Sequence, residues 1–148
     1  MRFVLAMLSI AVVSVAGAQT LGQTGAPTGA PTGAPTGQSL ADAATFGAVA
    51  TLAPLCGLRD EAWSFDLRRA AMQAATGSAA TDDAGLSRAP GNGQVAAALG
   101  YADMEALEDF AADTPAATCV ALRGNPALRR ADVAVNAFRR RRDGKPVG

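Results

Sequence analysis

The sequence contains no histidine, a single lysine at Lys145, one tryptophan and one tyrosine among its 148 residues. Without histidine the chain lacks the usual proton shuttle near neutral pH. Its serines therefore have no base to activate them, and no Gly-x-Ser-x-Gly segment surrounds any of them. Two cysteines without histidine also make a poor zinc set. We expect no catalytic residues, no metal site and no cofactor, and hence no enzyme.

Large apolar residues are also scarce, because much of the 49% hydrophobic content is alanine. Each fully buried large side chain contributes about 1.5–3 kcal/mol, which leaves a thin core for roughly a hundred ordered residues. A domain of this size is marginal and gains from a covalent brace.

The only long apolar run lies at the N-terminus, where Arg2 precedes an uncharged segment over 3–16. Ala16-Gly17-Ala18 then offers the small residues that a signal peptidase reads, so cleavage is expected between Ala18 and Gln19. The alternative is an uncleaved anchor, but the run falls short of the ~20 residues that span a bilayer. The sequence thus predicts a signal peptide over 1–18 and a mature chain without a transmembrane segment, located in the periplasm or secreted.

Residues 19–39 are predicted to form a disordered linker, in which Gly-Ala-Pro-Thr occurs three times in succession over 25–36. Proline at every fourth position forbids a helix, and glycine and alanine offer little to bury. The linker is either a spacer or a tandem duplication that the chain tolerates.

Residues 40–142 show helical spacing and no period-two alternation, which predicts an all-α fold, a small irregular bundle of about five helices. Asp42 and Asp60 are expected to cap the first two helices. The second helix is predicted to turn a stripe inward: Trp63, Leu67, Ala70, Ala71 and Ala74. Residues 143–148 are expected to form a flexible tail.

A loop rich in glycine and proline is expected over 76–93. Two short helices are predicted to follow over 94–99 and 103–112, separated at Gly100. The second of these is expected to face the core with four residues: Met104, Leu107, Phe110 and Ala111. Thr114-Pro115 and Asn125-Pro126 then predict the starts of the last two helices.

Cys56 and Cys119 are the only cysteines. An even count in an exported chain favours one structural disulfide. The alternatives are a metal pair, a redox pair and two free thiols, but no Cys-x-x-Cys motif is present.

Charge is unevenly spread, although the formal net charge is zero. Positions 19–128 hold five arginines and eleven acidic residues, whereas six arginines crowd the C-terminal region: Arg129, Arg130, Arg139, Arg140, Arg141 and Arg142. A helical wheel places 129, 130, 140 and 141 opposite the apolar stripe of the last helix, with 139 and 142 at its flanks. The cluster could bind an anionic surface. Alternatively it complements the helix dipole, keeps the protein soluble or pairs with the acidic body of the same chain.

The leading hypothesis is an exported, non-catalytic helical module that contacts an envelope protein or an envelope surface. The alternative is a binder of anionic envelope components, such as lipopolysaccharide, phospholipid or a polyanion, through the arginine cluster. A carboxylate-dependent hydrolase is a second alternative, with candidate acids at Asp82, Asp83, Glu105, Glu108, Asp109 and Asp113. No nucleic-acid partner is expected, because no recognition motif is present and the domain is not basic overall.

Overall fold

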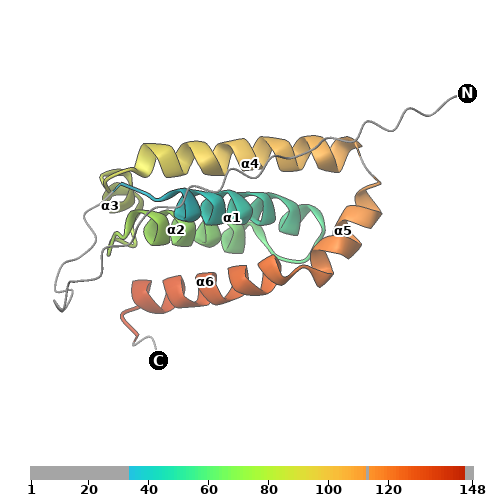
Figure 1. The fold of residues 1–148 in the computed structure, drawn as a ribbon. Coiled ribbons are helices and arrows are strands. Elements are labelled where there is room, and N and C mark those ends of the chain that lie inside the picture. The colour runs from blue at the N-terminus through green and yellow to red at the C-terminus, as the bar shows by residue number, and fades with distance from the viewer. Residues whose placement is uncertain (1–33, 113, 146–148) are drawn as a thin grey trace, which may run out of the picture.

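A computed structural model describes residues 34–112 and 114–145, and this part of the chain forms six helices and no strand (Figure 1). The helices are α1 (Gly37–Leu55), α2 (Glu61–Thr76), α3 (Asp83–Ser87), α4 (Asn92–Ala112), α5 (Pro115–Gly124) and α6 (Pro126–Arg142). In Figure 1, α4 and α6 lie on opposite sides of α1 and α2, and α5 lies across one end. The predicted all-α fold is confirmed. The expected signal peptide and its cleavage site at Ala18 and Gln19 lie outside the described residues.

The first helix begins earlier than the sequence indicated. Thr36 is its N-cap, and the Thr36 hydroxyl accepts a hydrogen bond of 3.2 Å from the Ser39 amide. The prediction of Asp42 as the cap is wrong, since Asp42 lies within α1. The structure therefore places the first turn of α1 inside the segment assigned to the linker.

The second helix begins where predicted. The Asp60 carboxylate accepts a 2.7 Å hydrogen bond from the Trp63 amide, and Gly77 closes the helix at φ 66°, in the left-handed region that favours glycine. Trp63 and Leu67 are buried as predicted. Ala74 is exposed, however, because the buried residues in the last turn of α2 are Gln73 and Thr76, on another side of the helix.

The prediction for the middle of the chain is partly wrong. A short helix, α3, lies inside the expected loop, and α4 is one continuous helix that Gly100 does not break. A helical glycine costs only about 1 kcal/mol relative to alanine, and packing against α1 holds the helix together. The predicted inward face is also wrong, since Met104 is 57% exposed and Leu107 is 48% exposed. Ala111 is exposed as well. The buried face of α4 consists instead of Val95, Leu99, Ala102 and Ala106.

Alanine dominates the core, and half of the buried hydrophobic residues are of this type. Small side chains let the helix backbones approach closely. A close approach of this kind occurs at Gly47 of α1, where an added Cβ would lie 2.9 Å from the Leu99 carbonyl oxygen of α4. Phe46, partly buried beside this crossing, packs against both apolar clusters of the core.

The predicted disulfide is confirmed. It joins Cys56, at the C-terminus of α1, to Cys119 in α5, with their Cα atoms 5.3 Å apart. Leu122 is the only buried residue of α5. The disulfide therefore adds a covalent link where noncovalent burial of α5 is small.

Candidate functional site

The arginine cluster predicted from the sequence lies on α6, whose ends and apolar face are well defined. The Asn125 side chain caps the helix by accepting a 2.8 Å hydrogen bond from the Ala127 amide, and Pro126 occupies the first turn. Leu128, Val135 and Phe138 are buried against the bundle. The four arginines from 139 to 142 occupy the last turn, where positive charge complements the helix dipole.

Two of the six arginines turn toward the protein and bind the buried carboxylate of Asp66 on α2. Arg139 Nε lies 2.6 Å from Asp66 Oδ2, and Arg142 Nη1 lies 3.0 Å from Asp66 Oδ1. The Asp66 side chain is only 7% exposed. One alternative inferred from the sequence is that the arginines pair with acidic residues of the same chain. Arg139 and Arg142 do so.

A further arginine joins this cluster from α2. Arg69 Nη1 lies 3.9 Å from Asp66, and Arg69 also forms two hydrogen bonds of 2.7 Å with Asp83 on α3. The hydrogen bond from Arg69 lowers the pKa of the Asp83 carboxyl, and the same contact raises the pKa of Arg69. These contacts tie α3, α2 and α6 together through charge.

A second ion pair joins the segment just before α2 to α6. Arg59 donates hydrogen bonds to both carboxylate oxygens of Asp132, from Nε at 2.8 Å and from Nη2 at 2.5 Å. The hydrogen bond to Asp132 raises the pKa of Arg59. Arg59 also lies over the Trp63 ring, 5.7 Å from its centroid. The negative charge of Asp132 is thereby neutralised by Arg59, so it does not offset the positive charge of the arginines on the outer face of α6.

The remaining four arginines form the outer face of α6: Arg129, Arg130, Arg140 and Arg141. All four are exposed, and none forms an ion pair within residues 34–112 and 114–145. Val133 lies between the two pairs of arginines and is 69% exposed. We call these five residues the α6 face. All of its charged residues are arginines, and Val133 forms an apolar centre.

An exposed aromatic residue lies beside the C-terminal end of α6. Phe65 of α2 is 60% exposed and borders a shallow hollow of about 640 Å³. Arg139 and Arg142 line the same hollow, together with Asp66. An aromatic side chain thus stands next to the basic helix.

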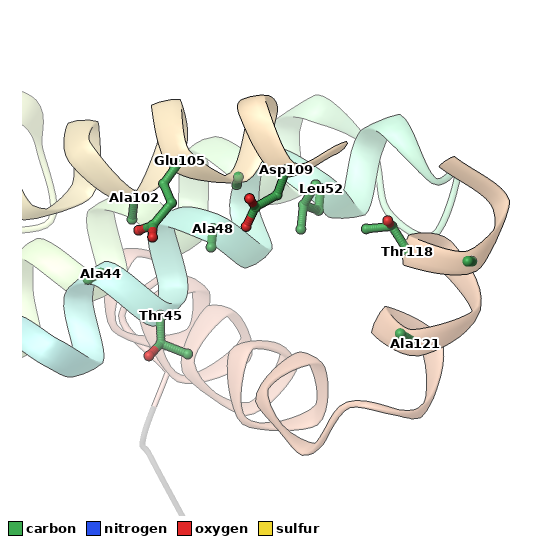
Figure 2. Close-up of a pocket in the computed structure, with 11 residues that line it drawn as sticks. Ala44, Thr45, Ala48, Leu52, Ala102, Glu105, Asp109, Thr118 and Ala121 are labelled. Carbon is green, nitrogen blue, oxygen red and sulfur yellow. The ribbon is translucent and has the colours of Figure 1, made fainter. Parts of the chain in front are cut away.

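A second hollow lies on another side of the molecule, between α1, α4 and α5 (Figure 2). It has a volume of about 650 Å³ and is lined mostly by alanines, with Glu105 and Asp109 of α4 along one rim. The two carboxylates lie one helical turn apart. An apolar group that carries a positive charge would complement this lining. The structure thus brings two of the sequence-predicted acids, Glu105 and Asp109, to one groove.

The other predicted acids have structural roles or face outward. The Asp82 carboxylate caps α3 by accepting a hydrogen bond of 3.2 Å from the Gly85 amide, and Asp83 pairs with Arg69. Glu108 is exposed on α4, and Asp113 lies outside the described residues. Within the part of the chain that the structure describes, no group of three or more cysteine, aspartate or glutamate residues could hold a metal ion.

Sequence reasoning missed Phe65 as a neighbour of the arginines and Asp66 as their partner. Phe65 is not a member of the predicted buried stripe of α2, and nothing in its neighbourhood in the sequence indicates that it lies near α6. The partner of a buried acid on another helix likewise has no local signal. No helix of the described residues is long and apolar enough to cross a membrane. No family model matches the chain, and no curated protein or solved structure matches it.

Proposed function

We propose that this protein is an exported, non-catalytic helical module that binds anionic phospholipid surfaces through the α6 face. One observation carries the proposal: four exposed arginines share a helix face on which no acidic side chain remains unpaired. Positive charge near an anionic membrane contributes about 1 kcal/mol per arginine. Four such residues are enough for reversible binding without any enclosed pocket.

Exposed apolar side chains favour a lipid surface over a soluble polyanion. Val133 lies within the α6 face, and Phe65 lies beside its C-terminal end. Basic residues interleaved with apolar ones are typical of segments that lie in the membrane interface. The Cys56–Cys119 disulfide supports an oxidising compartment outside the cytoplasm, in agreement with the predicted signal peptide.

The test compares two variants that each remove two positive charges from α6. Arg129→Gln with Arg140→Gln removes arginines without ion pairs, whereas Arg139→Gln with Arg142→Gln removes the two that bind Asp66. We expect the first variant to weaken binding to phosphatidylglycerol vesicles about 10- to 30-fold. The second variant should weaken binding less and should instead lower the melting temperature.

Salt and lipid composition supply the controls. Binding should fall steeply between low and high salt, because surface charges are screened. It should be absent on zwitterionic vesicles. Binding that is equally strong in the first variant would contradict the proposal, and binding to lipopolysaccharide or a polyanion without any binding to vesicles would contradict phospholipid as the target.

A further inference from the structure

The outer face of α4 carries an apolar stripe that no other helix of the described residues covers. Its six members follow steps of four and three residues in alternation, and all six are exposed: Gly93, Ala97, Gly100, Met104, Leu107 and Ala111. We call them the α4 stripe. It lies opposite the buried face of α4, which packs on α1. Figure 1 shows α4 at the edge of the bundle.

The spacing of this stripe identifies the kind of surface that would cover it. Alternating steps of four and three residues are the heptad spacing by which one helix packs along another. The stripe runs from Gly93 to Ala111, a rise of about 27 Å along the helix. Single exposed apolar residues are common on proteins, but a continuous stripe along a whole helix indicates an interface.

We propose that a second copy of this chain covers the stripe, with the two α4 helices antiparallel about a two-fold axis. The stripe is self-complementary in size. Its N-terminal half holds only glycine and alanine, and its C-terminal half holds Met104 and Leu107. Antiparallel packing places Met104 on Gly100 of the second copy and Leu107 on Ala97 of the second copy. Large side chains thus fill the spaces left by small ones.

Parallel packing of the same stripes would lack this complementarity. Met104 would meet Met104 of the second copy, and Leu107 would meet its own equivalent. The glycines and Ala97 would then face each other across a gap at the other end. Side chains crowded at one end and voids at the other both reduce stability.

Charge favours the same orientation. All the acids of α4 lie in its C-terminal half, and the helix contains no lysine or arginine. Asp103 is neutralised by Arg68, but Glu105, Glu108 and Asp109 have no ion-pair partner among the described residues. Antiparallel packing places these acids beside the uncharged N-terminal half of the second copy, whose helix end carries a partial positive charge. Parallel packing would align the acids of both copies.

The interface would be isologous and would close at two copies. Glu108 and Gln94 flank the stripe on the same side, so antiparallel packing brings Glu108 close to Gln94 of the second copy. The two copies of Tyr101, which is 75% exposed, would meet near the two-fold axis. The α6 face lies on the opposite side of the molecule and stays accessible, so this inference does not depend on the proposed function (Figure 1).

Sedimentation equilibrium of the purified protein tests the inference. The native chain should form a reversible dimer. Met104→Glu with Leu107→Glu should raise the dimer dissociation constant at least about 100-fold, because four carboxylates would enter an apolar interface. The matched control, Val120→Glu with Val133→Glu, changes two exposed apolar residues outside the stripe and should leave the dimer dissociation constant unchanged.

A second variant controls for the possibility that Met104→Glu with Leu107→Glu weakens the dimer only by unfolding α4. Ala97→Leu keeps a strong helix former at an exposed position, but its side chain would collide with Leu107 of the second copy. It should weaken the dimer while leaving the circular dichroism spectrum unchanged. A protein that remains monomeric at about 100 µM, or a dimer insensitive to both changes, would overturn the inference.

The orientation has its own test. Gln94→Lys should tighten the dimer about fivefold by pairing with Glu108 of the second copy at two symmetric positions, and added salt should abolish this gain. Adding Glu108→Gln should remove the gain. If Gln94→Lys leaves the dissociation constant unchanged, the antiparallel arrangement is wrong.

Discussion

The hydroxyl of Ser64 on α2 donates a 2.6 Å hydrogen bond to the backbone carbonyl of Ala50 on α1. The usual helical donor to this carbonyl would be the amide four residues later, but that residue is Pro54, which has no N–H. Ser64 is 1% exposed, so water cannot replace it. A side chain of α2 thus satisfies a carbonyl that the proline within α1 leaves without its donor.

We therefore expect Ser64→Ala to lower the free energy of unfolding by about 1–3 kcal/mol, because it leaves a buried carbonyl without a donor. Pro54→Ala restores a backbone N–H for Ala50. In that background Ser64→Ala should cost less, and chemical denaturation of the four proteins in the double-mutant cycle should give a coupling of about 1 kcal/mol or more. Equal costs in both backgrounds would show that the two residues act independently.

The triple contact at Asp66 gives a second prediction. Asp66→Asn removes the charge that holds Arg139 and Arg142, and it should lower the free energy of unfolding by about 1–3 kcal/mol, since both arginines remain partly exposed to water. Binding to anionic vesicles should not weaken, because the arginines are released and the net charge rises. The control is Asp143→Asn, whose exposed pair with Arg142 at 3.4 Å should contribute almost nothing. An unchanged melting temperature for Asp66→Asn would refute a stabilising role for the cluster.

The disulfide should carry a large share of the stability. Cys56 and Cys119 are 63 residues apart, and closing a loop of this length is worth about 4 kcal/mol in the chain-entropy model. We expect the double change to alanine to lower the free energy of unfolding by this order. Because Leu122 is the only buried residue of α5, hydrogen exchange should rise most in α5. Uniform exchange across all helices would argue against a local role.

Two glycines allow the steric effect of an added methyl group to be distinguished from the low helix propensity of glycine. Gly47→Ala should destabilise the protein, since the added Cβ would lie 2.9 Å from a backbone oxygen of α4. Gly100→Ala meets no atom within 4 Å and should stabilise the monomer by about 0.5–1 kcal/mol through helix propensity. Thermal unfolding of dilute protein measures both. Equal shifts in the melting temperatures of the two variants would mean that the α1 backbone at Gly47 is not in close contact with α4.

Local sequence signals account for much of the fold. The Asp60 cap, the Asn125-Pro126 start and the inward face of α6 follow from neighbours in the chain, and the structure agrees with each. The failures lie where tertiary packing decides. An amphipathic pattern in α4 does not say which of its two apolar faces is inside, and alanines rather than Met104 and Leu107 proved to be buried.

The candidate site likewise has features that follow from the local sequence and features that depend on tertiary packing. A helical wheel separates the exposed arginines of α6 from Arg139 and Arg142, because helix geometry alone fixes that separation. It cannot reveal that Asp66, more than seventy residues earlier, is their partner. Contacts between helices distant in sequence depend on how the bundle assembles.

The pair between Arg69 and Asp83 predicts a defined pH dependence. The hydrogen bond from Arg69 lowers the pKa of Asp83 below its ordinary value of 3.8. The unfolded chain therefore binds the proton more tightly, so the pair's stabilisation is complete above the unfolded pKa and is lost as the pH falls through the folded pKa. The melting temperatures of the native protein and of Asp83→Asn should differ by a constant amount above about pH 5 and converge in the acid range below pH 4.

The control for this pH dependence is Asp109→Asn, which changes an exposed carboxylate and should give a smaller difference in melting temperature at every pH. A difference between the native protein and Asp83→Asn that persists undiminished to the lowest pH would mean that the carboxylate does not stabilise α3 through its charge.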